Sequence, residues 1–221
     1  CGPDVAPVPA VGEPGGLGTR PGVSVAVSGG SDRGPLLVVL GDSLTAGLGL
    51  EDDQAYPALL QERFHRDGYD LTVVNAGVSG DTTAAGLRRA EWSLDGDVRI
   101  LIVALGGNDG LRGLPVEQMK QNLTEIVALA RDRGIPVLLA GMEAPPNYGS
   151  VYTAEFRAVF RDVADDFEVA FMPFLLDGVA AVPALNQPDG IHPTAEGSAI
   201  VANRVYEALA PLLVGLPSTV R

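Results

Sequence analysis

Five short apolar runs alternate with longer amphipathic stretches along the chain from about residue 34. Each run has the length of a strand, and in order they read PLLVVL, DLTVVNA, VRILIVAL, IPVLLAGM and EVAFMPF. Strands that alternate with helices predict βαβ units and a parallel sheet. The runs are almost continuously apolar, which is typical of strands with helices on both faces. The pattern therefore predicts an α/β fold, a three-layer α/β/α sandwich.

The amphipathic stretches have the periodicity and the end signals of helices. In one of them the apolar residues fall on a single helical face, namely Leu114, Met119, Leu123, Ile126, Val127 and Ala130. Gly134 stands where a glycine commonly ends a helix, so we expect this helix to stop there. A last helix is predicted over residues 195–213, and one of its faces carries Val201, Val205, Ala208 and Leu212. This helix should pack back onto the sheet.

Residues 1–33 lack this pattern. They are rich in Pro, Gly and Ser and show no sustained helical period, as in flexible linkers. We therefore divide the chain into a linker, 1–33, and a folded domain, 34–221. A Cys-Gly start followed by such a tether resembles a bacterial lipoprotein after removal of its signal peptide, and lipid on Cys1 would anchor the domain to a membrane. The alternative is that Cys1 is only the position at which a longer chain was cut. The first interpretation places the protein in the cell envelope or periplasm.

Composition narrows the chemistry that the domain can use. With 28 acidic and 15 basic residues the net charge is −13, and no cluster of Lys and Arg offers a phosphate-binding face, so nucleic acid is not an expected partner. The only cysteine is Cys1 and the only histidines are His65 and His192. These counts exclude disulfide frameworks and Cys/His zinc sites, and we expect no metal. No apolar run approaches the roughly 20 residues of a membrane-spanning helix.

Small polar residues follow the ends of four predicted strands. The four loops contain Gly41-Asp42-Ser43, residues 75–81, residues 106–109 and residues 189–193. In open parallel sheets the ligand crevice lies beyond the carboxyl ends of the strands, where such loops meet. We therefore expect the four loops to converge on one edge of the sheet.

These loops hold the parts of a nucleophilic site. A serine hydroxyl needs a base to take its proton, which predicts His192 as the base for Ser43. A carboxylate on the other ring nitrogen fixes the tautomer and balances the imidazolium charge, and Asp189 is close enough in the chain to do so. The N–H groups of Ser43 and Gly80 and the side-chain amide of Asn108 are candidates to stabilise a tetrahedral oxyanion.

Each of these residues also has a structural explanation. Ser43 could cap a helix, and Asp189-Gly190 is a common turn dipeptide. Gly80 could be a glycine because of the φ angle at its position, and Asn108 could form an Asx-turn. The combination favours the catalytic interpretation, because chance would have to place all of them on the same edge.

Two further polar features are left outside the site. His65 lies among charged residues near a predicted helix end, so we interpret it as a surface residue. Residues 122–124, Asn-Leu-Thr, match a glycosylation sequon but fall inside a predicted helix, so we interpret the match as chance.

The polar loops resemble the GDSL, or SGNH, hydrolase superfamily. Its four blocks occur in order as GDSL at 41–44, NAGVSGDT at 75–82, GGND at 106–109 and DGIHP at 189–193. Further stretches, SGDTTAAGLRR, LGGNDGLRG and PPNYG, are similar to the bacterial branch of multifunctional esterases, thioesterases and lysophospholipases. The resemblance covers nearly all of residues 35–213, and it departs from α/β-hydrolases in lacking a G-x-S-x-G elbow.

The resemblance implies a flavodoxin-like, five-stranded parallel sheet of order 2-1-3-4-5. It implies a Ser43-His192-Asp189 triad, an oxyanion hole from Ser43, Gly80 and Asn108, and no cofactor. The expected reaction is hydrolysis of carboxylic esters, whether acyl, aryl or lysophospholipid, and also of thioesters, through an acyl-enzyme. The alternatives are a carbohydrate O-acetylesterase and a noncatalytic flavodoxin-like binding module. FMN binding is disfavoured because no phosphate-cradling loop follows the first strand.

The loops beyond the third and fourth strands are the candidates for shaping an acyl pocket. Their candidate residues are Leu111, Leu114, Pro145, Pro146, Asn147 and Tyr148. The partner is expected to be a small-molecule or lipid ester, while the sequence does not predict an oligomeric state.

Overall fold

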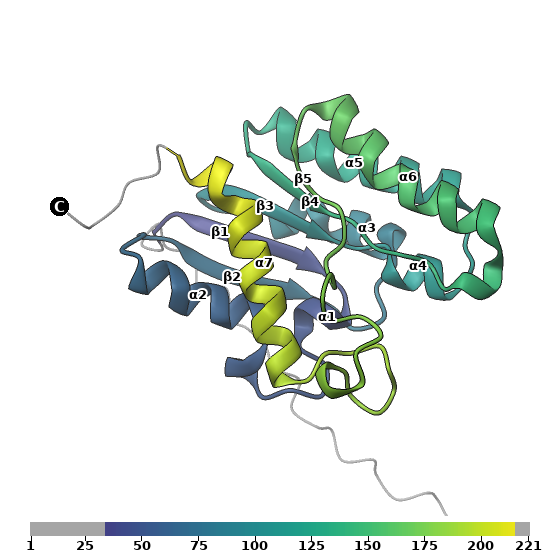
Figure 1. Cartoon of the computed structure of the whole chain (residues 1–221). Coiled ribbons are helices and arrows are strands. Elements are labelled where there is room, and N and C mark those ends of the chain that lie inside the picture. The colour runs from purple at the N-terminus through teal and green to yellow at the C-terminus, as the bar shows by residue number, and fades with distance from the viewer. Residues whose placement is uncertain (1–33, 215–221) are drawn as a thin grey trace, which may run out of the picture. The chain divides into compact units, whose positions relative to one another are not determined.

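A parallel sheet forms the centre of the computed structural model, which describes residues 34–214 (Figure 1). Its strands are β1 (Leu36–Gly41), β2 (Thr72–Gly77), β3 (Val98–Ala104), β4 (Val137–Ala140) and β5 (Ala170–Met172). They lie in the order β2-β1-β3-β4-β5, and every neighbouring pair is parallel. The predicted fold class and strand order are confirmed. The linker predicted over 1–33, with Cys1, lies outside the described residues.

Helices cover both faces of the sheet (Figure 1). The long ones are α2 (Tyr56–Arg66), α3 (Thr83–Ser93), α5 (Val116–Asp132), α6 (Ser150–Phe167) and α7 (Ala195–Leu213). Helices α2 and α7 pack together on one face, and α3, α5 and α6 pack in succession on the other. Shorter turns are α1 (Ser43–Ala46), α4 (Gly107–Leu111), η1 (Asp52–Gln54), η2 (Pro146–Tyr148) and η3 (Pro183–Leu185). Among residues 34–214, no helix is long and apolar enough to cross a bilayer.

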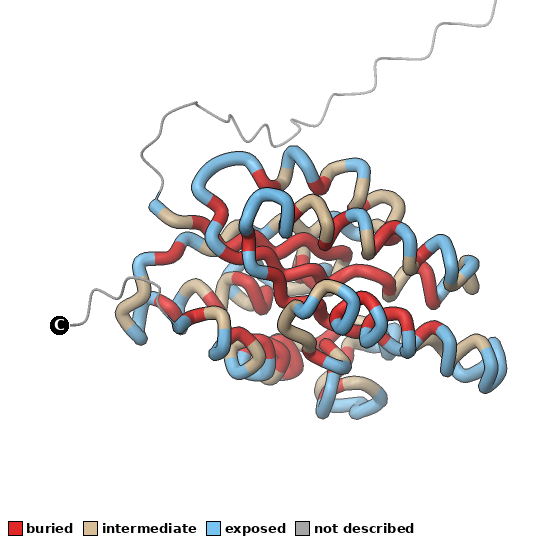
Figure 2. Tube along the Cα trace, turned by 90° about the horizontal axis from the view of Figure 1, so that it is seen from above, coloured by how far each residue is buried: buried red, intermediate tan, exposed pale blue. Residues whose placement is uncertain are grey.

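The core runs through the middle strands. Figure 2 shows buried residues along the centre of the molecule, and all six residues of β1 are buried. Strand β2 is only partly buried because it lies at the edge of the sheet.

The helices largely follow their predicted apolar faces, with small differences at their ends. Helix α5 starts at Val116 after Pro115, so Leu114 precedes it instead of lying on its face. It ends before Gly134, whose φ of 69° fits the predicted stop. In α7 the buried stripe is Val201, Val205, Leu209 and Leu213, while Ala208 and Leu212 are half-buried.

The first three strands end level with one another. Gly41 at the end of β1 pairs with Gly77 of β2 and with Ala104 of β3. The polar loops that follow these strands therefore start from one line at the edge of the sheet. Gly77 permits α1 to pack closely there, because a Cβ atom on it would lie 2.3 Å from the backbone nitrogen of Ala46.

Candidate active site

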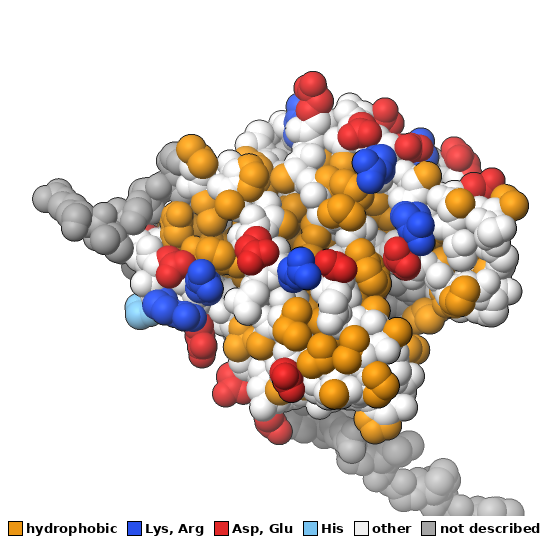
Figure 3. All heavy atoms as spheres, in the orientation of Figure 1, with side chains coloured by type: hydrophobic (Ala, Val, Ile, Leu, Met, Phe, Trp, Pro, Cys, Tyr) orange, Lys and Arg blue, Asp and Glu red, His pale blue; other side chains and the backbone are white. Residues whose placement is uncertain are grey.

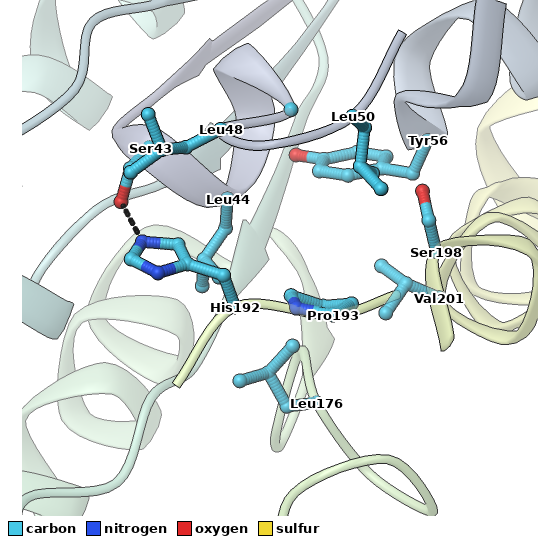
Figure 4. Close-up of a pocket in the computed structure, with 11 residues that line it drawn as sticks. Ser43, Leu44, Leu48, Leu50, Tyr56, Leu176, His192, Pro193, Ser198 and Val201 are labelled. Carbon is cyan, nitrogen blue, oxygen red and sulfur yellow. Dashed lines mark hydrogen bonds between the residues drawn. The ribbon is translucent and has the colours of Figure 1, made fainter. Parts of the chain in front are cut away.

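Ser43 is the first residue of α1, immediately beyond β1. Asp42, not Ser43, caps this turn, since its Oδ1 accepts a hydrogen bond of 3.0 Å from the Leu44 N–H. The Ser43 hydroxyl points instead toward the imidazole of His192, and its Oγ lies 2.8 Å from Nε2 (Figure 4). Ser43 is thus not the helix cap that its position allowed, and its hydroxyl bonds to a base.

His192 is held by Asp189 on its other side. Nδ1 lies 2.7 Å from Asp189 Oδ2, while Asp189 Oδ1 accepts the N–H groups of Ile191 and His192 at 2.9 and 3.0 Å. The hydrogen bond from His192, followed by those two N–H groups, lowers the pKa of Asp189 to about 2. An ionised carboxylate only accepts hydrogen bonds, so Nδ1 carries a proton and the Nε2 of the neutral ring accepts the Ser43 hydroxyl proton. Asp189 therefore both forms the turn and orients the ring.

Two backbone N–H groups, one in the loop after β1 and one in the loop after β2, are available as donors. Within residues 34–214, the N–H groups of Ser43 and Gly80 have no hydrogen-bond acceptor. Gly80 has a φ of 86° and occupies the third position of a type II turn. The turn is closed by a hydrogen bond of 3.1 Å from the Asp81 N–H to the Val78 carbonyl. The carbonyl of Gly80 accepts a bond of 2.9 Å from Arg112 at the end of α4.

Asn108 supplies a third donor from the first turn of α4. Its Nδ2 donates a hydrogen bond of 3.3 Å to Asp42 Oδ2, which leaves the second N–H of the amide for another acceptor. Asp42 is buried, with 2% of its surface exposed, and this burial raises its pKa to about 6. A buried carboxyl thus sits directly before Ser43 and orients the amide of Asn108.

An apolar cavity of about 380 Å³ opens beside Ser43 and Asn108, a size within the range of small-molecule sites. Its apolar wall includes Leu44, Leu111, Met142, Pro146, Phe174 and Leu176. A second space touching Ser43 and His192 measures only about 10 Å³ between side chains that include Leu50, Tyr56 and Val201 (Figure 4). Of these two spaces beside Ser43, only the larger cavity has the volume to hold a small molecule.

The candidate pocket residues divide into two groups. Leu111, Pro145 and Pro146 line the larger cavity, whereas Leu114, Asn147 and Tyr148 do not. The Tyr148 hydroxyl donates instead to the carbonyl of Leu111 at 3.0 Å, and its ring packs against Tyr152 with centroids 5.4 Å apart. Tyr148 thus supports the cavity wall from outside.

The sequence prediction missed the opposite wall of the cavity. Phe174, Leu176, Ala180 and Ala181 come from the irregular segment between β5 and α7. Figure 3 shows hydrophobic side chains gathered on the lobe that this segment forms. An apolar stretch without helical or strand period was the only sequence signal for it.

Neither of the two polar features left outside the site lines the larger cavity. His65 is an exposed residue of α2. Asn122 is buried on α5 and its Nδ2 donates to Thr83 Oγ1 at 3.0 Å, so the sequon is not accessible in the folded chain. In the described part of the chain, no group of three His, Cys, Asp or Glu side chains could hold a metal ion.

Comparison with known proteins identifies the family. Residues 39–200 match the GDSL-like Lipase/Acylhydrolase family. The chain is 44% identical over 178 residues to Esterase TesA of Pseudomonas aeruginosa, which covers 80% of this chain and 89% of that protein. It is 37% identical over 178 residues to Thioesterase 1/protease 1/lysophospholipase L1 of Escherichia coli K12, and this match covers 80% of this chain and 84% of that protein.

A solved structure with the same architecture is that of the psychrotrophic esterase EstA from Pseudoalteromonas sp., inhibited by monoethylphosphonate. The TM-score is 0.77 at 31% identity, and the match covers 80% of this chain and 98% of EstA. The family match, the relatives and the shared fold agree with one another. The chain therefore belongs to the GDSL-like lipase/acylhydrolase family of ester hydrolases.

Proposed function

We propose that the chain is a serine esterase in which Ser43 is the nucleophile, His192 the general base and Asp189 the residue that orients the base. One observation carries the proposal. Three side chains form a hydrogen-bonded series that starts at the wall of an apolar cavity. Ser43 Oγ lies 2.8 Å from His192 Nε2, and His192 Nδ1 lies 2.7 Å from Asp189. Distances below about 3 Å are those at which a base takes a proton from a nucleophile.

In the first step, Ser43 Oγ forms a bond to the ester carbonyl carbon while its proton passes to His192 Nε2. The carbonyl electrons move onto oxygen, and the N–H groups of Ser43 and Gly80 with the amide of Asn108 stabilise the resulting anion. When the carbonyl re-forms, the bond to the leaving oxygen breaks and that oxygen takes the proton from His192. Water then repeats these steps on the acyl-enzyme and releases the acid and free Ser43.

The cavity favours substrates with an acyl chain longer than acetyl. Its wall is mostly apolar and its volume is about 380 Å³, so an alkyl chain gains burial that an acetyl group cannot. The relatives named esterase, thioesterase and lysophospholipase support acyl esters, lysophospholipids and thioesters as substrate classes. The phosphonate-inhibited EstA supports a nucleophilic serine.

The experiment is hydrolysis of p-nitrophenyl esters from acetyl to palmitoyl by the wild-type chain and by Ser43→Ala. Ser150→Ala, an exposed serine at the start of α6, is the matched control. We expect a maximum at medium chain length, at least a 10³-fold loss in Ser43→Ala, and no change in Ser150→Ala. Activity on acetyl esters alone would favour a carbohydrate O-acetylesterase, and equal rates in Ser43→Ala and wild type would contradict the triad.

The same proposal includes a membrane tether. Cys1 lies outside the described residues, and a cysteine next to a Pro/Gly/Ser-rich stretch that leads to the folded domain supports a lipid anchor and a location in the cell envelope. The test is partition of the full chain, expressed with a lipoprotein signal peptide, into a detergent phase. We expect wild type in the detergent phase and Cys1→Ser in the aqueous phase, and the same phase for both would contradict the anchor.

A further inference from the structure

Arg89 of α3 reaches the edge of the sheet where the candidate active site lies. Its Nη2 donates to the carbonyl of Gly41, its Nη1 to the carbonyl of Ala76 and its Nε to the carboxylate of Asp81, each at 2.7 Å. Only 16% of the Arg89 side chain and 14% of the Asp81 side chain are exposed. A guanidinium that makes three short bonds in a mostly buried place is held in a single orientation.

The three acceptors belong to the segments that carry two of the candidate oxyanion donors. Gly41 is two residues before Ser43, and its carbonyl also accepts the Val78 N–H at 3.0 Å. Ala76 is the penultimate residue of β2, which leads into the Gly80 loop, and Asp81 directly follows Gly80. Arg89 therefore joins the end of β1, the end of β2 and the Gly80 turn through one rigid side chain.

Arg89 is connected to both ends of the turn that contains Gly80. The peptide unit before Gly80 lies inside the turn from Val78 to Asp81. Arg89 binds the Asp81 side chain at the end of this turn. It also binds the Gly41 carbonyl, which accepts the Val78 N–H at the start of the turn. An oxyanion donor is effective only where the N–H already points at the developing charge. A shift of the turn away from Ser43 would reduce stabilisation of the transition state more than binding of the neutral ester.

We propose that Arg89, with Asp81, is a positioning residue that aligns the N–H groups of Gly80 and Ser43 into one oxyanion hole. The inference rests on the proposed function, since it assumes that Ser43 attacks an ester. Arg89 itself does not touch the substrate: among the residues described, it is absent from the wall of the cavity. It acts through the backbone that it holds.

The neighbouring Arg88 provides a matched control. It is exposed, and its Nη1 donates to the carbonyl of Ala84 on its own helix at 3.1 Å. Arg88→Met and Arg89→Met thus make the same chemical change at adjacent positions of α3, and only the second removes the link between the strand ends and the Gly80 turn.

The first measurement is of kcat and KM on a soluble p-nitrophenyl ester for wild type, Arg88→Met, Arg89→Met and Asp81→Asn, with Ser43→Ala in parallel. We expect Arg89→Met to lose about 10- to 100-fold in kcat with KM changed less than threefold, because losing a complete oxyanion donor typically costs about 10²- to 10³-fold. Asp81→Asn, which keeps the two bonds of Arg89 to the strand ends, should lose about threefold to tenfold. Arg88→Met should match wild type.

The second measurement separates alignment from general loosening of the fold. An alkylboronic acid forms a tetrahedral anion on a reactive serine and so reports on the oxyanion hole. Its inhibition constant should rise in Arg89→Met by about the factor lost from kcat. Thermal unfolding of each variant checks that it is folded, and Asp81→Asn carries the test if Arg89→Met does not fold.

The outcomes are distinct. If Ser43→Ala is inactive but folded Asp81→Asn and Arg89→Met keep kcat and boronate affinity within twofold of wild type, the proposed function stands and the role of Arg89 is overturned. A rise in KM alone also overturns it. If Ser43→Ala is as active as wild type, the proposed function and the role of Arg89 fall together.

Discussion

His192 Nε2 lies 2.8 Å from Ser43 Oγ although 149 residues separate the two in the chain. The parallel sheet brings them together, because Ser43 follows the interior strand β1 and the loop of His192 returns to the same edge after β5. Asp189 then fixes the ring from the opposite nitrogen.

Asp189→Asn should lower kcat by about 10²-fold or more. The substitution removes the negative charge that fixes the His192 tautomer and balances the imidazolium formed during attack, and its effect in a buried triad reaches about 10⁴-fold. We expect a smaller loss here because 45% of the Asp189 side chain is exposed to water. Turnover at pH 8 checks this, with Asp177→Asn, an exposed carboxylate paired with Arg204, as the control. A loss below twofold in Asp189→Asn would contradict the orienting role.

Asn108→Ala should lower kcat by about 10²- to 10³-fold and leave KM within about threefold, because the amide would donate to the anion formed in the transition state. The exposed Asn203→Ala on α7 serves as the control. Steady-state kinetics on one ester decide the matter. An effect confined to KM would show that Asn108 binds the ground state instead.

Asp42→Asn should stabilise the fold increasingly as the pH rises. The pKa of Asp42 is about 6 in the folded chain against an ordinary 3.8, so the folded state holds this proton more tightly than the unfolded state. The wild type therefore loses stability as pH rises from about 4 to above 6, and Asn has no such proton to lose. From pH 5 to pH 8, the free energy of unfolding of Asp42→Asn should rise by about 1 kcal/mol relative to wild type. Urea unfolding at both pH values measures it, and a difference that does not depend on pH would refute it.

Ala144→Phe should shorten the acyl chain that the enzyme accepts. Ala144 lines the larger cavity, and a phenyl ring there would occupy space needed by a longer chain. We expect kcat/KM for an octanoyl ester to fall about tenfold while that for an acetyl ester stays within about threefold, since one or more methylenes are worth about this much in a pocket. Val151→Phe, at an exposed position of α6, is the control. Equal losses on both esters would place the acyl chain elsewhere.

The fold was predictable because its strands and helices are periodic and their ends carry local signals. Gly134 stops α5 through its positive φ, and the first three polar loops each lie at the end of a strand. The register that aligns Gly41 with Gly77 and Ala104 then brings the first three loops to one edge, and the hydrogen bond between His192 and Ser43 places the fourth loop beside them. Residues at such strand ends could be assigned to a site from the sequence, since a parallel sheet leaves little freedom in where they lie.

Residues whose role depends on side-chain direction were not predictable in this way. Arg88 and Arg89 are adjacent in the same amphipathic stretch, but only Arg89 turns toward the strand ends. Tyr148 follows two prolines near the cavity, yet its hydroxyl bonds to the Leu111 carbonyl. The cavity wall around Phe174 comes from a segment with no periodic pattern, so its course depends on tertiary packing.

The central claim is that Ser43 is the nucleophile, and covalent labelling tests it most directly. We would treat the chain with a p-nitrophenyl alkylphosphonate and measure intact mass, then locate the adduct by peptide mass spectrometry, with Ser43→Ala and Ser150→Ala in parallel. The account predicts one adduct per chain on Ser43 in wild type and Ser150→Ala, and none in Ser43→Ala. An adduct in Ser43→Ala equal to that in wild type, or no adduct in an active wild-type enzyme, would contradict it.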